Sequence, residues 1–164
     1  ERLCDESLFY NVNVEELQDR LILRKMKGHL SKEEAIDFYN NSSYHPSIVI
    51  GDNVVFNNSC HIGATNRIII GNDVVVASRV FITDHFHGNT TYNDLQIPVR
   101  NRLLYSKGPV VIGNNVWIGE GASILPNVTI GDNSIVAAHA VVTKNIPANS
   151  IAVGCPARII RTIN

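Results

Sequence analysis

The sequence predicts an all-β protein in the form of a parallel β-solenoid, and three features of residues 48–153 lead to this prediction. Aliphatic side chains recur at every sixth position, and a second apolar or small residue stands two positions before each of them. Segments such as Gly-Asp-Asn follow several repeats, and these residues tolerate the backbone angles of tight corners. A helix would need an apolar spacing near 3.6 residues, and an ordinary sheet would need longer alternating strands. A spacing of six predicts that three hexapeptides form one triangular turn and that successive turns stack.

Both sets of repeated residues should point into the prism. The first set consists of Ile50, Phe56, Ile62, Ile70, Val76, Ile82, Ile112, Ile118, Ile124, Ile130, Val136 and Val142. The second set consists of Ile48, Val54, Cys60, Ile68, Val74, Val80, Val110, Val116, Ala122, Val128, Ser134 and Ala140. The corner segments begin at Gly51, Gly71, Gly113 and Gly131. The repeats predict about five to six turns between residues 48 and 153.

Residues 1–47 differ from the repeats and carry about half of the charged side chains. Two side-chain pairs with the spacing of N-terminal capping boxes predict short helices over roughly 14–27 and 32–40. The apolar stripe of the first helix must pack on something. We expect residues 1–47 to form a helical cap on the end or flank of the solenoid, with a separate binding module as the alternative.

Composition limits the partners and the compartment. Fourteen basic and fifteen acidic residues give a net charge of −1, so no strong field would draw the chain to nucleic acid or to an anionic membrane. No apolar run approaches the ~20 residues that span a bilayer, so we expect no membrane insertion. The cysteines Cys4, Cys60 and Cys155 are odd in number and far apart, which favours a reducing, cytoplasmic compartment over a disulfide framework.

The six-residue rhythm breaks twice. Between Ile62 and Ile70 the spacing is eight residues, so residues 64–67 should bulge at one corner. Between Ile82 and Ile112 no hexapeptide is visible, so residues 88–108 should leave the solenoid as a long loop. This loop is too rich in aromatic, aliphatic and arginine side chains for a simple linker, and long loops in compact domains are usually functional or disordered. We expect an arm that reaches toward a neighbouring chain.

The segment ITDHFHG places Asp84, His85 and His87 at the start of the second interruption. A neighbouring carboxylate can orient an imidazole for work as a general base. His85 or His87 is therefore a candidate catalytic base, with a satisfied surface histidine as the alternative for each. No GxSxG motif supports a serine nucleophile, and Cys60 falls on an inward position.

A metal site is the competing interpretation of these histidines. His85 and His87, together with His61 or His139 from another face across a subunit interface, could form a three-His zinc site with an open position. Such a site would resemble that of the γ-type carbonic anhydrases. Zinc bound to chelator-free protein would favour this interpretation.

Several segments of the chain resemble the hexapeptide-repeat acyltransferases. Besides the repeats and ITDHFHG, these are NNVWIG at 114–119, VVTKNIP at 141–147 and GCPARIIR at 154–161. They are similar to segments of the acetyl-CoA-dependent sugar acetyltransferases of the maltose, galactoside and polysaccharide O-acetyltransferase branch. The resemblance implies a left-handed parallel β-helix, which is an exception to the usual right-handed crossover. It also implies a homotrimer with active sites between adjacent prisms.

The resemblance assigns roles to residues on the acceptor side. His85 matches the catalytic histidine of the family, which takes the proton from an acceptor hydroxyl as that hydroxyl attacks the thioester of acetyl-CoA, without an acyl-enzyme. Asn57 and Ser43 match acceptor-binding residues, and Asp84 and His87 are further candidates on this side.

The resemblance also implies a coenzyme site along the C-terminal coils, completed by a tail at 154–164. Cationic side chains there suit the phosphates of the coenzyme, with solvated surface charges as the alternative interpretation. The candidate coenzyme-binding residues are Trp117, Glu120, Ala138, Thr143, Lys144, Arg158 and Arg161. Acetyl-CoA is the expected co-substrate, and no metal is expected.

We therefore expect an O-acetyltransferase that moves acetyl from acetyl-CoA to a hydroxyl of a sugar, either a nucleotide sugar or a saccharide of a surface polysaccharide. An acidic acceptor contact of the galactoside branch falls on Thr65, a departure that argues against a galactoside acceptor. Acetylation of the amino group of an amino sugar uses the same machinery and stays open, as does the zinc enzyme.

Overall fold

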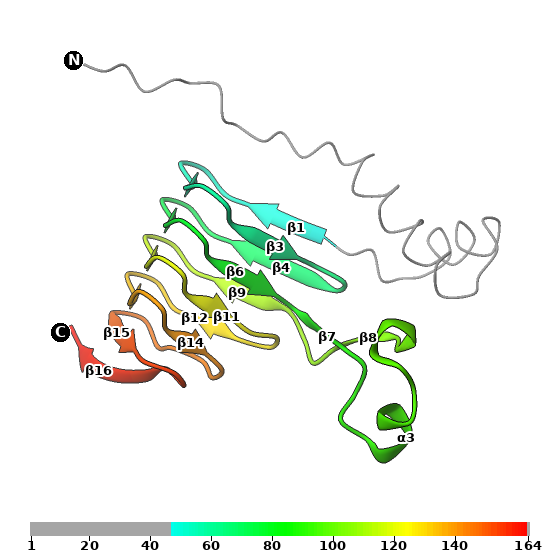
Figure 1. The fold of residues 1–164 in the computed structure, drawn as a ribbon. Coiled ribbons are helices and arrows are strands. Elements are labelled where there is room, and N and C mark those ends of the chain that lie inside the picture. The colour runs from blue at the N-terminus through cyan, green and yellow to red at the C-terminus, as the bar shows by residue number, and fades with distance from the viewer. Residues whose placement is uncertain (1–46, 164) are drawn as a thin grey trace. The chain divides into compact units, whose positions relative to one another are not determined.

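The structure is a computed structural model that describes residues 47–163. Its main body consists of three parallel sheets of short strands that stack as coils along one axis (Figure 1). Apart from Ser47 in the first strand, the predicted cap at 1–47 lies outside the described residues. This includes its predicted helices over 14–27 and 32–40 and the predicted acceptor residue Ser43. Within the described range, no helix is long and apolar enough to cross a membrane.

Neighbouring strands are parallel within each sheet, apart from the last pair of the second sheet, β15 and β16, which is antiparallel. The first sheet contains β1 (Ser47–Ile50), β4 (Arg67–Ile70), β9 (Val110–Ile112) and β12 (Thr129–Ile130). The second contains β2 (Val55–Phe56), β5 (Val75–Val76), β10 (Trp117–Ile118), β13 (Ile135–Val136), β15 (Ser150–Val153) and β16 (Arg158–Thr162). The third contains β3 (His61–Gly63), β6 (Phe81–Thr83), β11 (Ser123–Ile124) and β14 (Val141–Val142).

The chain passes through the three sheets in turn, so three consecutive solenoid strands make one coil. The described residues contain four complete coils, and β15 belongs to a fifth that ends when β16 folds back along it. The prediction of about five to six turns is slightly too high, because the fifth coil is incomplete and the chain returns as β16 after β15. The stacked parallel coils are those of the β-helix that the sequence predicts, with the left-handed form implied by the resemblance.

The repeated aliphatic residues form one continuous core along the solenoid axis. All predicted inward positions from Ile68 to Val142 are buried, and Ile146 and Ala152 extend the core into the last coil. Full burial of a valine or isoleucine side chain contributes about 1.5–3 kcal/mol. Ile50 in the first coil is 48% exposed, because only one neighbouring coil among the described residues packs against it.

The corners are held by a ladder of side-chain oxygens. Asp52 donates its backbone N–H to Asn72 Oδ1 at 2.8 Å, Asn72 donates to Asn114 Oδ1 at 2.9 Å, and Asn114 donates to Asp132 Oδ1 at 2.7 Å. These partners are 20, 42 and 18 positions apart in the sequence. A regular coil therefore has 18 residues. The first coil has 20 because of the insertion at 64–67, and the separation of 42 residues includes the arm.

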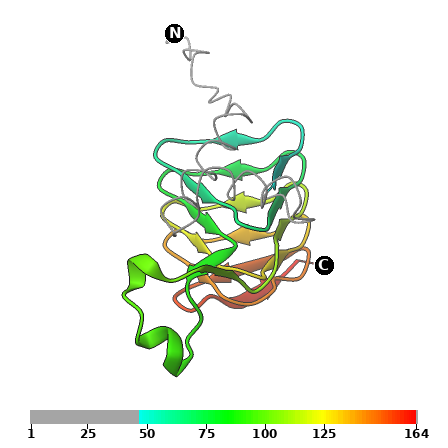
Figure 2. The same cartoon turned by 90° about the vertical axis from the view of Figure 1, so that its right-hand side faces the viewer.

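The second interruption of the repeat forms an arm that projects from the solenoid (Figures 1 and 2). β7 (His85–His87) and β8 (Leu104–Ser106) pair as an antiparallel ribbon at its root. A short helix, α3 (Tyr92–Leu95), and a 3-10 turn, η1 (Val99–Asn101), form its tip. The predicted loop begins at 88, whereas in the structure the ribbon already begins at His85.

Candidate active site

His85 lies where the wall of the solenoid continues into the arm. β6 ends at Thr83, Asp84 follows it, and β7 begins at His85. The side chain of His85 is 9% exposed and that of Asp84 is 0% exposed. An imidazole and a carboxylate are therefore held together at the root of the arm, largely shielded from water.

The carboxylate of Asp84 accepts hydrogen bonds at both oxygens. Its Oδ1 accepts from the backbone N–H of Thr65 at 2.8 Å and from the Thr65 hydroxyl at 3.2 Å, and it lies 3.1 Å from His85 Nδ1. Its Oδ2 accepts from the backbone N–H of Asn66 at 2.7 Å. Burial raises the pKa of Asp84, but the hydrogen bonds from His85, Thr65 and Asn66 outweigh burial and hold this pKa below its ordinary value. Asp84 is therefore ionised at neutral pH.

Both backbone donors to Asp84 belong to the insertion at residues 64–67. β3 ends at Gly63 and β4 begins at Arg67, so Thr65 and Asn66 lie in the corner between the third sheet and the first. The insertion makes this coil 20 residues long instead of 18. The insertion at 64–67, which is the first interruption of the repeat, thus donates hydrogen bonds to the carboxylate of Asp84, which stands at the second interruption.

Asp84 also determines the tautomer of His85. A carboxylate only accepts hydrogen bonds, so Nδ1 of His85 carries the ring proton and donates it to Asp84 Oδ1. Thr83 Oγ1 lies 3.1 Å from the same nitrogen and restrains the ring further. Nε2 keeps a free lone pair, which is the form that a general base requires.

A second imidazole borders His85 on the outer face of the third sheet. The ring of His61 stacks on Phe81, with centroids 5.1 Å apart and planes inclined by 10°. A Cβ atom at Gly63 would lie 3.2 Å from both His61 Nε2 and His85 Cε1, so the two rings lean over the same glycine. From the sequence, His61 is a candidate only as a zinc ligand. Its outward place between the inward Cys60 and Ile62 is the signal that could have placed it beside His85.

The other predicted acceptor residues lie at different distances from His85. The ring of His87 is close to that of His85, with centroids 6.5 Å apart and planes at 67°. Asn57 is exposed and follows β2 at the corner between the second and third sheets, whereas His85 stands at the corner between the third and the first. Within one chain the structure does not bring Asn57 to His85. Ser43 lies outside the described residues.

The arm contains a pocket of about 330 Å³ near its root. The ammonium group of Lys107 lies 5.5 Å from the centre of the Phe86 ring, which forms part of the pocket wall. The pocket is lined by Phe86, His87, Gly88, Asn89, Thr90, Leu95, Arg102, Tyr105 and Lys107. The sequence predicts a functional loop here but singles out only His87 of these residues for the site.

Three of the predicted coenzyme residues lie on or beside the second sheet. Trp117 is on β10 and is 55% exposed. Glu120 and Ala138 are exposed at the corner that follows β10 and β13. Glu120 is paired with the guanidinium group of Arg79, which stands one coil earlier at the same corner. The carboxylate of Glu120 therefore has a structural partner of its own.

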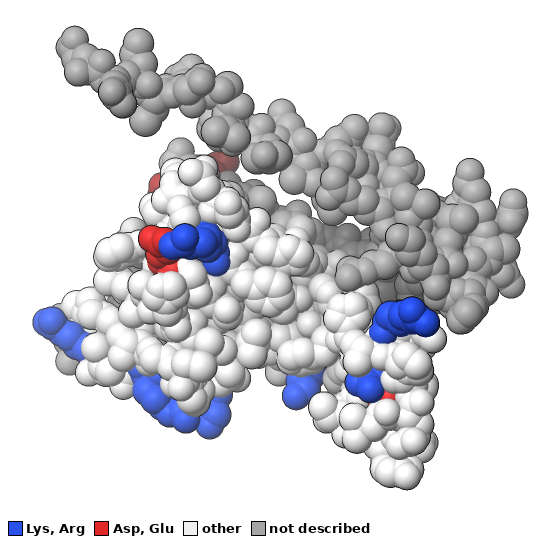
Figure 3. All heavy atoms as spheres, viewed as in Figure 1, with Lys and Arg blue, Asp and Glu red and all other residues white. Residues whose placement is uncertain are grey.

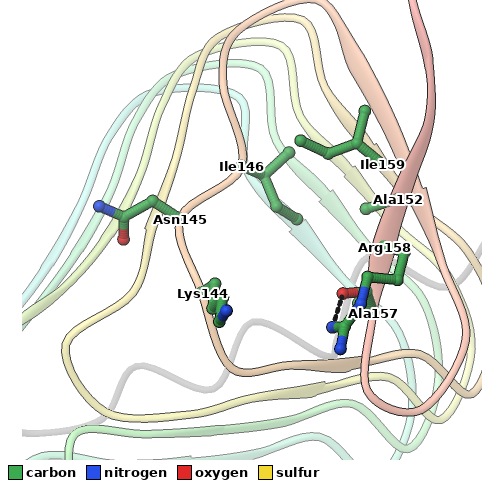
Figure 4. A pocket seen from close by; sticks show the side chains of 7 residues that line it. All are labelled: Lys144, Asn145, Ile146, Ala152, Ala157, Arg158 and Ile159. Atoms are coloured by element: carbon green, nitrogen blue, oxygen red, sulfur yellow. Dashed lines mark hydrogen bonds between the residues drawn. The ribbon is translucent and has the colours of Figure 1, made fainter.

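The remaining coenzyme candidates gather at the C-terminal end of the solenoid. Lys144 and Arg158 stand on opposite sides of a pocket of about 190 Å³ (Figure 4). Arg158 donates from Nη1 to its neighbour's carbonyl, Ala157 O, at 2.9 Å. Thr143 is exposed beside Lys144, and Arg161 lies on β16 opposite Ile151. In the view of Figure 3, basic side chains stand at this end of the solenoid and on the arm.

Metal ligands do not cluster in the part of the chain that the structure describes. Residues 47–163 contain no group of three or more His, Cys, Asp or Glu side chains arranged to hold a metal ion. The zinc site considered for this sequence takes its third histidine from another subunit, so it concerns an assembly rather than the single chain.

Comparison with known proteins relates this architecture to a family. The family model of bacterial transferase hexapeptide repeats, six repeats long, matches residues 109–144. WbbJ of Escherichia coli K12, provisionally named a lipopolysaccharide biosynthesis O-acetyl transferase, is 42% identical over 121 residues, which are 71% of this chain and 61% of WbbJ. The galactoside O-acetyltransferase of the same organism is 42% identical over 122 residues, which are 74% of this chain and 57% of that protein.

A solved structure extends the comparison to most of the chain. The galactoside acetyltransferase in complex with coenzyme A superimposes with a TM-score of 0.58 at 31% sequence identity, covering 92% of this chain and 84% of that one. By contrast, the chain spans only 61% and 57% of the lengths of the two curated relatives.

Proposed function

Because this chain belongs to the hexapeptide-repeat acetyltransferase family, we propose that it transfers an acetyl group from acetyl-CoA to a hydroxyl group of a sugar. One observation carries the proposal. A buried, ionised Asp84 holds the Nδ1–H of His85, so that Nε2 is free to accept a proton at a corner of the solenoid. A general base in this form is what direct attack by a hydroxyl requires.

The proposed reaction is a single acyl transfer. His85 Nε2 takes the proton from the acceptor hydroxyl while the hydroxyl oxygen attacks the thioester carbonyl carbon. A C–O bond forms and the C–S bond breaks, and His85 then gives the proton to the departing thiolate. The products are the acetyl ester and the free thiol of coenzyme A. Asp84 stabilises the imidazolium that forms between these two steps, as a carboxylate does in other acyl-transfer sites.

The donor side of the proposal rests on the C-terminal end of the solenoid. The galactoside acetyltransferase of known structure binds coenzyme A, and this chain presents Lys144 and Arg158 across one pocket with Arg161 further along β16. Guanidinium and ammonium groups are good partners for the phosphates of a nucleotide coenzyme. In this proposal Trp117, Glu120, Ala138 and Thr143 border the rest of the coenzyme.

The acceptor side requires more than one copy of the chain. Asn57 and His85 stand at different corners of the same prism, so Asn57 can join a site at His85 only when it comes from a neighbouring subunit. We propose a homotrimer that acts in the cytoplasm, where acetyl-CoA is made. The name of WbbJ supports a saccharide destined for a surface polysaccharide as the acceptor. Thr65 is already bound to Asp84, which agrees with a different acceptor from that of the galactoside enzymes.

The proposal is tested by replacing His85 and by identifying the product. His85→Ala should reduce kcat for transfer from acetyl-CoA to a panel of nucleotide sugars and oligosaccharides by roughly 10²- to 10⁴-fold. Thermal protection by acetyl-CoA and the oligomeric state should stay as in the unaltered protein, because His85 lies away from the coenzyme pocket. A product that mild alkali cleaves is an ester and supports O-acetylation, whereas a stable product is the amide of an amino sugar. Full activity of the variant would overturn the role of His85.

A further inference from the structure

His61 is an oriented imidazole that the proposed reaction does not yet use. It begins β3, faces outward and is exposed, yet the stack on Phe81 at 5.1 Å holds the plane of its ring. Phe81 is directly opposite His61 in the register of β3 and β6. Neither nitrogen of the His61 ring forms a hydrogen bond with another residue in the described range.

Gly63 allows the rings of His61 and His85 to approach each other. A Cβ atom at this position would lie 3.2 Å from His61 Nε2 and 3.2 Å from His85 Cε1, closer than most Cβ atoms approach a neighbour. Thr83 Oγ1 would be 3.8 Å from the same point. On the outer face of the sheet the two imidazole rings therefore come close together above a residue without a side chain, so one acceptor molecule could contact both.

The two rings are not equivalent. Nδ1 of His85 is occupied by Asp84 and Thr83, so its remaining nitrogen is the one that takes the proton. His61 has no such carboxylate partner in the described range, and a neutral imidazole can both donate and accept hydrogen bonds. A second donor on the attacking oxygen would lower its nucleophilicity, so His61 is better suited to a different oxygen of the acceptor.

We infer that His61 binds the hydroxyl group adjacent to the one that His85 deprotonates, so that the acceptor is a sugar with two neighbouring free hydroxyl groups. The inference rests on the proposed O-acetyl transfer and adds to it a feature of the substrate. The adjacent hydroxyl bonds to His61 Nε2 over Gly63, and this contact directs the attacking oxygen toward His85. A site that hydrogen-bonds a substrate hydroxyl discriminates against an analogue that lacks it.

The test compares acceptors that differ by one hydroxyl. Methyl hexopyranosides and their monodeoxy derivatives are the probes, and kcat/KM is measured for the unaltered protein, His61→Phe and His85→Ala. His61→Phe retains the stack on Phe81 and removes the nitrogen. We expect it to lower kcat/KM for the best diol acceptor by roughly 10- to 100-fold, which corresponds to one hydrogen bond to a substrate hydroxyl, and to leave kcat/KM for the adjacent-deoxy derivative unchanged. His61→Gln keeps a hydrogen-bonding group and should recover part of the loss.

The outcomes separate the inference from the function on which it rests. If the unaltered protein acetylates hexosides and His61→Phe still prefers the diol by the same factor, the inference is wrong and the transferase proposal stands. If neither the unaltered protein nor any variant acetylates a hydroxyl compound, both are overturned. Histidine-selective NMR provides a readout that does not depend on turnover. The diol, but not its deoxy derivative, should shift the His61 ring resonances, and the absence of that shift would count against the inference.

Discussion

Thr65 donates its backbone N–H to the carboxylate of Asp84 over 2.8 Å, although the two residues are 19 positions apart in the sequence. Asn66 donates to the other oxygen of the same carboxylate at 2.7 Å. Two residues that lengthen one coil therefore stabilise a charge in the next coil. This charge in turn holds the ring of His85, so the insertion and the candidate base form one unit.

Asp84→Asn removes the negative charge of this residue but keeps a side chain of nearly the same size, so it tests the effect of the charge. The amide has one oxygen and one NH2 group, so one of the backbone donors from Thr65 and Asn66 faces another donor. We expect the free energy of unfolding to fall by about 1–3 kcal/mol. We also expect kcat to fall by roughly 100-fold or more, because the imidazolium of His85 loses its counter-charge and its tautomer is no longer fixed. Steady-state kinetics at saturating acetyl-CoA and urea unfolding measure the two effects.

Asp132→Asn is the matched control for that variant. Asp132 also accepts a backbone N–H, from Asn114 at 2.7 Å, but it does so at an exposed corner of the ladder. Its replacement should leave kcat within about twofold of the unaltered protein, since no imidazole depends on it. Equal kcat values for Asp84→Asn and Asp132→Asn would contradict the role of Asp84.

The stability of the protein should depend on pH through Asp84. The pKa of this carboxyl is lower in the folded chain than its ordinary value of 3.8. A group of this kind contributes stability that is fully present above the pKa of the unfolded chain and is lost as the pH falls through the folded pKa. The difference in unfolding free energy between the unaltered protein and Asp84→Asn should therefore be constant near neutrality and shrink in acid below about pH 4. Urea titrations between neutral and acidic pH measure it, and a difference that does not change with pH would refute the assignment.

The sequence predicts the solenoid well, because the same short pattern of inward apolar residues and corner residues is repeated in every coil. Each inward position from Ile68 to Val142 follows from the six-residue spacing alone, and each is buried. The number of coils is predicted slightly too high, since the spacing does not show that the fifth coil stops after β15. The two interruptions are visible as spacing errors at Ile62 and Ile82, but their length says nothing about the contacts they make.

The candidate site likewise contains residues that the sequence identifies and contacts that it does not. His85 and Asp84 can be identified from one heptapeptide, because they are adjacent in sequence. The contribution of Thr65 and the approach of His61 toward His85 depend on which residues of successive coils stand opposite one another. His61 pairs with Phe81 and Gly63 with Thr83 only because the insertion sets the register of these coils at 20 residues. A spacing pattern without the three-dimensional register could not supply these contacts.

The coenzyme proposal predicts an effect on binding rather than on chemistry. Lys144→Ala and Arg158→Ala should each raise KM for acetyl-CoA by roughly 3- to 10-fold with little change in kcat, since both side chains are exposed and their attraction for phosphate is partly screened. The increase should become smaller at high ionic strength. Arg100→Ala is the control, because Arg100 is an exposed arginine on η1 in the arm. A KM that stays unchanged in both coenzyme-site variants would place the phosphates elsewhere.

The exposed apolar residues of the arm predict that it contacts another subunit. Leu103 is 75% exposed in the single chain, and several other large apolar residues of the arm are also exposed. Exposed apolar groups that gather on one projecting element are typical of a surface that binds a partner. Leu103→Asp should therefore weaken the proposed trimer, so that sedimentation velocity detects smaller species at concentrations where the unaltered protein remains assembled. Asn93→Asp on α3 introduces the same charge at an exposed polar position and should leave the assembly intact.

Acetyl transfer should fall in parallel with the loss of the trimer, because Asn57 can reach His85 only from a neighbouring subunit. A monomer of Leu103→Asp with full activity would show that the site is complete within one chain.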